Sequence, residues 1–141
     1  MKAKKCDDIC KMTIMYVDDD ADVSAMVLHM LSKNYPTQKV VHAENGIDAL
    51  SKIRECDPEI LLVDIYMPLL DGITFIEKYV SERLAIIVSA CNNKELMQRC
   101  LTVGARYYVT KPIDFDFLFY SMDTLMLELF YKRFARAKPN L

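Results

Sequence analysis

The sequence predicts an α/β fold: a doubly wound, five-stranded parallel sheet with five flanking helices. Short apolar runs rich in β-branched residues alternate along the chain with longer segments of helical period. The runs at 60–63 and 84–88 show no alternation of polar and apolar residues, which is typical of strands buried on both faces. Parallel strands need a long crossover between them, usually a helix, and the helical segments supply it.

The elements follow from these patterns in order. Strands are expected at 12–17, 39–42, 60–63, 84–88 and 106–109. Helices are expected at 23–33, 45–56, 73–81, 93–103 and from about 114 to 137. Asp71 is a candidate N-cap of the third helix, and Gly104 is a candidate C′ residue of the fourth. The residues expected to face inward on the first two helices are Val23, Met26, Val27, Met30 and Leu31, then Ile47, Leu50 and Ile53.

Length and composition limit the class of protein. The 141 residues suit one domain, with a core at about 11–129 and an extended last helix and tail at 130–141. A net charge of −2 and a pI near 5.7 argue against direct nucleic-acid binding. The most apolar stretch is short for a membrane span and contains acidic residues. An odd number of cysteines, five, suits reduced thiols, so we expect a cytoplasmic protein without a membrane anchor.

Polar residues follow the ends of four predicted strands. Asp18 and its two acidic neighbours follow the first strand, Asp64 the third, Ser89 the fourth and Lys111 the fifth. In a doubly wound sheet the carboxyl ends of the strands meet at one edge, where ligands bind. Several carboxylates, a hydroxyl and an ammonium are therefore expected in one crevice.

This set of groups favours phosphoryl chemistry. Clustered carboxylates repel each other unless a cation neutralises them, and hard oxygen ligands suit Mg²⁺. A carboxylate beside the metal can attack phosphorus and form an aspartyl phosphate. The oxygens of the transferred group need fixed partners, which Mg²⁺, the Lys111 ammonium and the Ser89 hydroxyl could supply.

At these residues the chain resembles the receiver domains of two-component response regulators, single-domain chemotaxis regulators in particular. The matching segments are TIMYVDDD (13–20), LLVDIYMPLLDGI (61–73), IIVSA (86–90) and YYVTKPID (107–114). The resemblance implies a flavodoxin-like sheet with strand order 2-1-3-4-5. It also implies a bacterial signalling switch that catalyses only its own phosphorylation and dephosphorylation, rather than an enzyme.

The resemblance assigns roles residue by residue. Asp64 would be the phosphoacceptor, and Ser89 and Lys111 would contact the phosphoryl group. Mg²⁺ would be bound by Asp18, Asp19, Asp64 and the backbone carbonyl of Tyr66, with Asp18 acting mostly through water. Ser89 and Tyr108 would form the switch, and the Lys111–Pro112 peptide is commonly cis in this family.

Other functions fit less well. Phosphatases of the haloacid-dehalogenase type place a second Asp two residues after the nucleophile, where this chain has Tyr66. A flavodoxin-like electron carrier needs a glycine-rich phosphate loop, and this chain has only three glycines. Two alternatives stay open: a receiver cut from a longer regulator with an output domain, and a degenerate receiver that acts only as a binding module.

Partners follow from the resemblance and from the last helix. A histidine kinase or phosphotransfer protein would supply the phosphoryl group, and a downstream protein or a linked output domain would respond to it. The last helix carries more apolar residues than one sheet face needs, including Leu118, Met122, Leu125 and Leu129 on one side and Phe119, Met126 and Phe130 on another. We therefore expect self-association through this helix or docking of a target.

Overall fold

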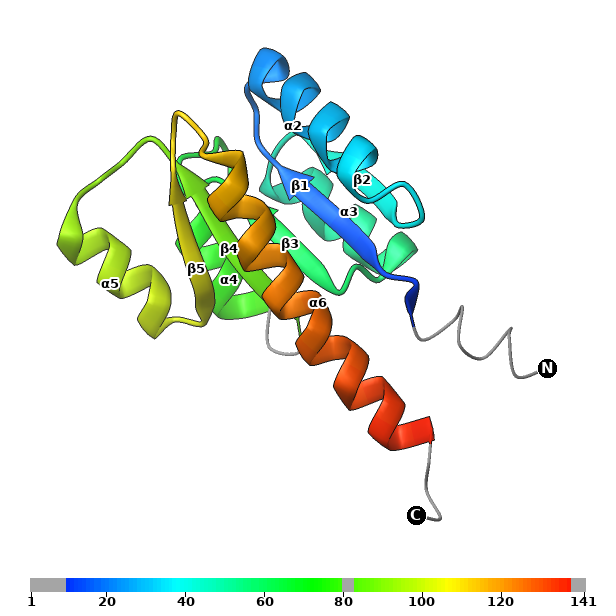
Figure 1. Cartoon of the computed structure of the whole chain (residues 1–141). Coiled ribbons are helices and arrows are strands. Elements are labelled where there is room, and N and C mark those ends of the chain that lie inside the picture. The colour runs from blue at the N-terminus through cyan, green and yellow to red at the C-terminus, as the bar shows by residue number, and fades with distance from the viewer. Residues whose placement is uncertain (1–9, 80–82, 138–141) are drawn as a thin grey trace.

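A computed structural model describes residues 10–79 and 83–137 and contains the expected sheet (Figure 1). Five parallel strands lie in the order β2-β1-β3-β4-β5. The strands are β1 (Thr13–Val17), β2 (Lys39–Ala43), β3 (Ile60–Val63), β4 (Leu84–Ser89) and β5 (Ala105–Thr110). The helices in the described ranges are α2 (Ala21–Asn34), α3 (Gly46–Cys56), α4 (Gly72–Tyr79), α5 (Lys94–Thr102) and α6 (Phe115–Ala137). The predicted fold class and strand order are confirmed.

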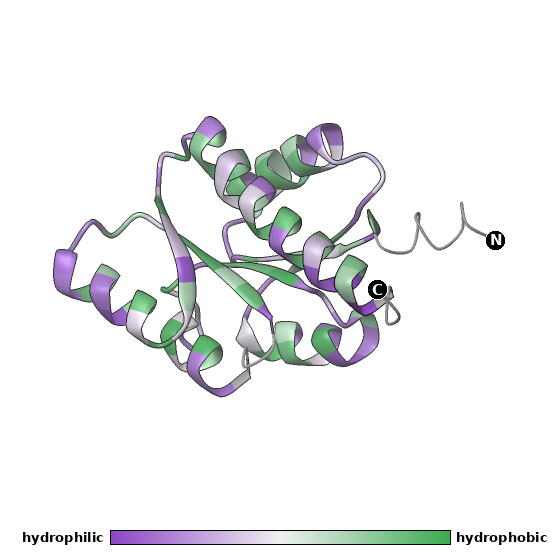
Figure 2. Ribbon diagram, turned by 60° about the horizontal axis from the view of Figure 1, so that its bottom comes forward, coloured by the Kyte–Doolittle hydropathy of each residue, from purple (hydrophilic) through white to green (hydrophobic). Residues whose placement is uncertain are grey.

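The helices cover both faces of the sheet and make three layers (Figure 2). Helices α2 and α6 pack on one face through Val27, Leu31, Leu118 and Met122. Helices α3, α4 and α5 pack on the other, through residues that include Ala49, Phe75, Ile76 and Cys100. Every residue of β3 is buried, as the unbroken apolar run predicts for a central parallel strand.

Two inward-facing residues were predicted wrongly. Met26 on α2 is 46% exposed, and Ile47 on α3 is 53% exposed. Successive residues of an α-helix are rotated by about 100° around the helix axis. Met26 and Ile47 each lie roughly this angle away from the centre of the buried face of their helix. On α2 the buried position is instead taken by Ser24, a polar residue with a partner at the site described below.

The predicted helix ends agree with the structure to within a few residues. The Asp71 side chain accepts a hydrogen bond from the Thr74 N–H at 2.9 Å and so caps the start of α4. Gly104 follows α5 with a φ of 125°, in the region that favours glycine. The predicted end of the third helix, Ser81, lies outside the described residues.

Helix α6 carries apolar residues on two sides. Leu118, Met122 and Leu125 are fully buried against the sheet, and Phe119, Met126 and Leu129 pack around them. The expectation that Phe119 and Met126 lie on an unpartnered side is therefore wrong. The exposed side is a second run of residues at alternating spacings of three and four, the outer stripe: Phe117, Tyr120, Thr124, Leu127, Tyr131 and Phe134.

The last turns of α6 are tied to the amino-terminal edge of the sheet. The Arg133 guanidinium donates to the Lys11 carbonyl and to Glu59 Oε1, both at 2.6 Å. Glu59 precedes β3, and its other oxygen accepts from the Thr13 N–H of β1 at 2.6 Å. None of the helices in the described ranges is long and apolar enough to cross a membrane.

Candidate phosphoryl-transfer site

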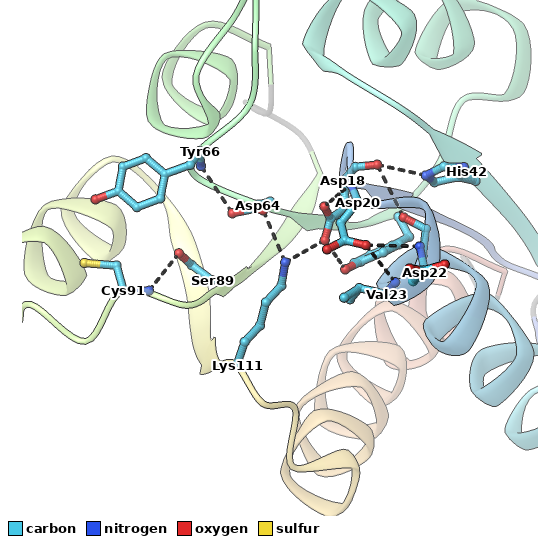
Figure 3. A network of polar contacts seen from close by, with 12 residues as sticks. Asp18, Asp20, Asp22, Val23, His42, Asp64, Tyr66, Ser89, Cys91 and Lys111 are labelled. Carbon is cyan, nitrogen blue, oxygen red and sulfur yellow. Dashed lines mark hydrogen bonds and ion pairs between the residues drawn. The ribbon is translucent and has the colours of Figure 1, made fainter.

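Three carboxylates meet at the carboxyl edge of the sheet. Figure 3 shows two of them, Asp18 and Asp64, on either side of Lys111. Oxygen atoms of Asp18, Asp19 and Asp64 lie within 4.8 Å of one another. Asp18 is fully buried, Asp64 is nearly so, and Asp19 is exposed. Asp20 does not join them, because its Oδ1 accepts from the N–H groups of the first turn of α2 and caps that helix. Of the three consecutive acids, Asp18 and Asp19 thus belong to the site and Asp20 caps α2.

Lys111 lies between the two buried carboxylates. Its Nζ is 2.7 Å from Asp18 Oδ2 and 3.2 Å from Asp64 Oδ2. Burial lowers the pKa of Lys111, but the two carboxylates outweigh burial and the net shift is upward. Burial raises the pKa of Asp64, and the nearby Asp18 charge adds to it against the opposing effect of Lys111. The carboxylates around Asp64 therefore outnumber the one ammonium, and the site carries excess negative charge.

Asp18 is held from several directions. Its Oδ2 accepts the Tyr16 hydroxyl at 2.6 Å as well as Lys111, and its Oδ1 accepts the Asp20 N–H at 2.9 Å. Its backbone carbonyl contacts the Ser24 hydroxyl at 3.3 Å and His42 Nε2 at 3.0 Å. The sequence analysis did not identify these three side-chain partners. A signal for Tyr16 existed, since residues two apart on a strand point to the same side.

Ser89 and Tyr108 come from the neighbouring strands. Ser89 is fully buried at the end of β4, and its Oγ accepts the Cys91 N–H at 3.2 Å. The Tyr108 side chain lies inward, 9% exposed, and its hydroxyl donates to the Cys91 carbonyl at 2.6 Å. The Lys111 N–H donates to the Ser89 carbonyl at 2.8 Å, which fixes the start of the loop that carries the cis Lys111–Pro112 peptide.

The loop after β3 shapes the open side of the site. The Tyr66 N–H donates to Asp64 Oδ1 at 3.2 Å, while its side chain is 62% exposed. Tyr66 and Cys91 line a surface cavity of about 320 Å³ together with residues at the start of α5. Gly72 lets α4 approach this loop, because a Cβ there would lie 2.4 Å from the Asp64 carbonyl oxygen. The approach keeps the backbone around Asp64 in place.

The residues present suit a hard divalent cation. Three carboxylates and one ammonium leave a formal charge of about −2, which Mg²⁺ would neutralise. Asp19 is exposed and available, and Asp64 keeps free oxygen lone pairs because it accepts only single hydrogen bonds from Tyr66 and Lys111. A ligand role for the Tyr66 carbonyl stays a prediction.

Comparisons with known proteins identify the family of this chain. The family profile described as response regulator receiver domain matches residues 14–122. The chain belongs to the response regulator receiver domain family. It is thus a CheY-like receiver of a two-component system, a class of signalling switches rather than of conventional enzymes.

Curated relatives of this receiver include short and long proteins. It is 35% identical to chemotaxis protein CheY of Treponema pallidum over 72% of the chain and 73% of that protein. It is 34% identical to CheY of Bacillus subtilis over 73% of the chain and 88% of that protein. It is also 33% identical to a protein-glutamate methylesterase/protein-glutamine glutaminase of Halalkalibacterium halodurans, but spans only 31% of that protein.

Solved structures give the same fold. The receiver domain of a Francisella response regulator aligns with a TM-score of 0.76 and 26% identity, over 83% of this chain and 98% of that one. The receiver domain of a Vibrio parahaemolyticus Luxo repressor protein aligns with a TM-score of 0.79 at 21% identity, over 89% of this chain and 97% of that one. The second likeness supports the fold alone.

Proposed function

We propose that this receiver accepts a phosphoryl group on Asp64 in an Mg²⁺-dependent reaction and thereby changes its surface. The observation that carries the proposal is the convergence of Asp18, Asp19, Asp64 and Lys111 at one edge of the sheet. Asp18 and Asp19 follow β1, Asp64 follows β3 and Lys111 follows β5, so their meeting depends on the order of three strands in the sheet. The donor would be a histidine kinase or a phosphotransfer protein.

Each residue has a defined task in this proposal. Asp64 Oδ attacks the phosphorus atom of the donor, and the bond to the donor's nitrogen breaks. Asp19 and Asp64, with the Tyr66 carbonyl, would bind Mg²⁺ directly, and Asp18 would act through water. When bound, the ion would supply positive charge to the oxygens of the transferred group. Lys111 moves from the Asp18 carboxylate to one phosphoryl oxygen, and the Ser89 hydroxyl donates to another.

The switch lies next to the acceptor. If Ser89 turns to the phosphoryl group, its Oγ leaves the Cys91 N–H, and the backbone that binds the Tyr108 hydroxyl can shift with it. We propose that this movement passes to the surface made by α5, β5 and α6. A phosphoryl group adds roughly −1.5 to −2 charges at neutral pH, which is enough to bias such an equilibrium.

Intact mass measurement tests the function. The protein is incubated with acetyl phosphate, with and without Mg²⁺, as wild type and as Asp64→Asn. One added phosphoryl group that requires Mg²⁺ and is absent from the variant supports the proposal. A well-folded wild type that gains no mass would instead favour a degenerate receiver that acts as a binding module.

The wider setting is also a proposal. We infer a cytoplasmic protein that forms one receiver domain over 1–141, with its core at about 11–129, and that does not itself bind nucleic acid. A receiver within a longer regulator is the alternative, because some relatives are about three times as long as the matched segment. In that case a linked output domain takes the place of a separate downstream protein.

We propose that the outer stripe of α6 binds a second copy of this chain. Apolar residues at alternating spacings of three and four are the pattern by which two helices pack along a seam. Exposed acids lie in the first half of α6, at Asp116 and Asp123, and exposed bases lie in the second, at Lys132 and Arg136. An antiparallel pair of α6 helices places opposite charges together, whereas a parallel pair places like charges together.

Sedimentation tests this dimer. Wild type is expected to dimerise as concentration rises, and Leu127→Glu in the middle of the stripe is expected to be monomeric. Met26→Glu is the matched control, since Met26 is exposed to a similar degree on α2. A wild type that stays monomeric at high concentration, with and without a phosphoryl mimic, would contradict the dimer.

A further inference from the structure

Tyr16 is a buried polar residue directly beneath the proposed phosphorylation site. It is fully buried on the face of the sheet that α2 and α6 cover, among apolar side chains such as Ile14, Val27 and Leu62. Its ring stacks on His42, with centroids 6.3 Å apart and planes 27° apart. A phenylalanine would fill this place equally well, so core packing alone does not require the hydroxyl.

The hydroxyl has one hydrogen-bond acceptor, Asp18 Oδ2. The distance of 2.6 Å is that of a short, charge-assisted hydrogen bond to a carboxylate. Burial, reinforced by Asp18, raises the pKa of Tyr16 far above its usual range, so the hydroxyl keeps its proton and donates. Asp18 Oδ2 therefore has two donors at once, the Tyr16 hydroxyl and the Lys111 ammonium.

The proposed function requires Lys111, one of these two donors, to leave Asp18 Oδ2. To reach a phosphoryl group on Asp64, the ammonium must lengthen or break its 2.7 Å contact with Asp18. Asp18 is fully buried, and a buried carboxylate that loses its partner is strongly destabilised. Some group must keep Asp18 Oδ2 satisfied after Lys111 has moved.

We propose that Tyr16 is a positioning residue whose hydroxyl holds Asp18 Oδ2 while Lys111 transfers to the phosphoryl group. The inference rests on the proposed function of Asp64. Without the hydroxyl, Asp18 retains Lys111 more strongly, because the ammonium is then its only side-chain donor at that oxygen. Tyr16 acts through Asp18 and Lys111 and does not touch the transferred group.

The test compares two ligands, Mg²⁺ alone and beryllofluoride with Mg²⁺, on the full chain. Beryllofluoride imitates a phosphoryl group on a carboxylate and would draw Lys111 away, whereas Mg²⁺ alone leaves Lys111 on Asp18. We expect Tyr16→Phe to weaken beryllofluoride binding about tenfold or more, since hydrogen bonds to charged groups are of that strength. Mg²⁺ binding is expected to change less than about threefold. Calorimetry and fluorine NMR measure the two affinities.

Tyr35→Phe is the matched control. Tyr35 is buried on the same face and donates to Asp123 Oδ1 at 2.7 Å, away from the site. The Tyr35→Phe variant should lose stability as Tyr16→Phe does, but should bind beryllofluoride with wild-type affinity. In an Asp18→Asn background, Tyr16→Phe should add little further loss, because the acceptor charge is already gone.

The outcomes separate the two proposals. If wild type binds no beryllofluoride in the presence of Mg²⁺, the proposed function fails. If wild type binds it and Tyr16→Phe binds equally well or more tightly, only the role of Tyr16 is overturned. An equal loss for Mg²⁺ and beryllofluoride would also overturn it, because it would indicate a general disturbance of the site.

Discussion

At the scale of single residues, Lys111 offsets part of the negative charge of the site. It contacts two carboxylates, and its side chain is only 16% exposed while those of Asp18 and Asp64 are 0% and 11% exposed. Contacts so far from solvent are weakly screened by salt. We therefore expect Lys111 to contribute to the stability of the unphosphorylated protein in addition to its proposed role in phosphoryl transfer.

Lys111→Met is expected to lower the free energy of unfolding by about 3 kcal/mol at neutral pH, because two buried carboxylates lose their cation. Millimolar Mg²⁺ should restore much of the lost stability, because the ion replaces the positive charge of the Lys111 ammonium. Burial already raises the pKa of Asp64, and loss of Lys111 raises it further. A raised carboxyl pKa means that the folded state binds the proton more readily, so the deficit should shrink as pH falls toward that pKa.

Urea unfolding with and without Mg²⁺, at pH 7 and pH 5, measures these effects. Lys132→Met is the control, since Lys132 is 58% exposed and lies 3.5 Å from Glu128. A deficit in Lys111→Met that Mg²⁺ does not reduce would contradict the electrostatic explanation.

At the scale of elements, α4 depends on its first turn. Gly72 at its start packs against the loop that carries Asp64. The Asp71 carboxylate accepts from the Thr74 N–H at 2.9 Å and from the Thr74 hydroxyl at 2.8 Å. The cap satisfies a backbone N–H that has no partner within the helix, so it contributes to the stability of α4.

Asp71→Ala is expected to cost about 1 kcal/mol of stability through loss of the cap. The backbone hydrogen bond from Thr74 lowers the pKa of Asp71, so its contribution is present above the unfolded pKa of about 3.9 and is lost as pH falls below it. Thermal unfolding of wild type and variant from pH 7 to pH 3 measures the difference. Asp71→Asn, which keeps a capping oxygen, should lose less, and an equal loss in both variants would contradict the role.

The order and type of the elements could be predicted from the sequence, since period and apolar runs depend on local composition. Helix faces were less predictable, because they depend on how each helix is turned on the sheet. Met26 and Ile47 are apolar yet exposed, while Ser24 is polar yet buried with the Asp18 carbonyl as its acceptor. On α6 a buried and an exposed apolar side occur in one helix, and spacing alone does not say which is which.

At the scale of the whole molecule, sheet topology brings the site together. The meeting of Asp18, Asp64 and Lys111 could be predicted because parallel strands end at one edge. The support beneath the site was predictable only in part. Tyr16 lies two residues before Asp18 on one strand, but His42 lies in a strand pattern that suits an ordinary core residue. The place of His42 becomes visible only when β1 and β2 are paired, with Tyr16 opposite His42.

Arg133→Met is expected to lower the stability of the protein without slowing the phosphorylation of Asp64. Its guanidinium joins the Lys11 carbonyl and Glu59 at the amino edge of the sheet, far along the strands from Asp64. Loss of these charge-assisted bonds should cost about 2 kcal/mol, while the rate of Asp64 phosphorylation by acetyl phosphate stays unchanged. Lys111→Met, by contrast, should lose both. A slower phosphorylation of Arg133→Met in fully folded protein would contradict this separation.

The position of the Arg133 contacts also means that two partners could bind this receiver at the same time, one at each end of the strands. A partner that bound the last turns of α6 would meet the molecule where its strands begin, and a kinase that acted on Asp64 would meet it where they end. The two need not compete for the same surface. Substitutions at Arg133 and at Asp64 would therefore probe the two ends of the sheet separately.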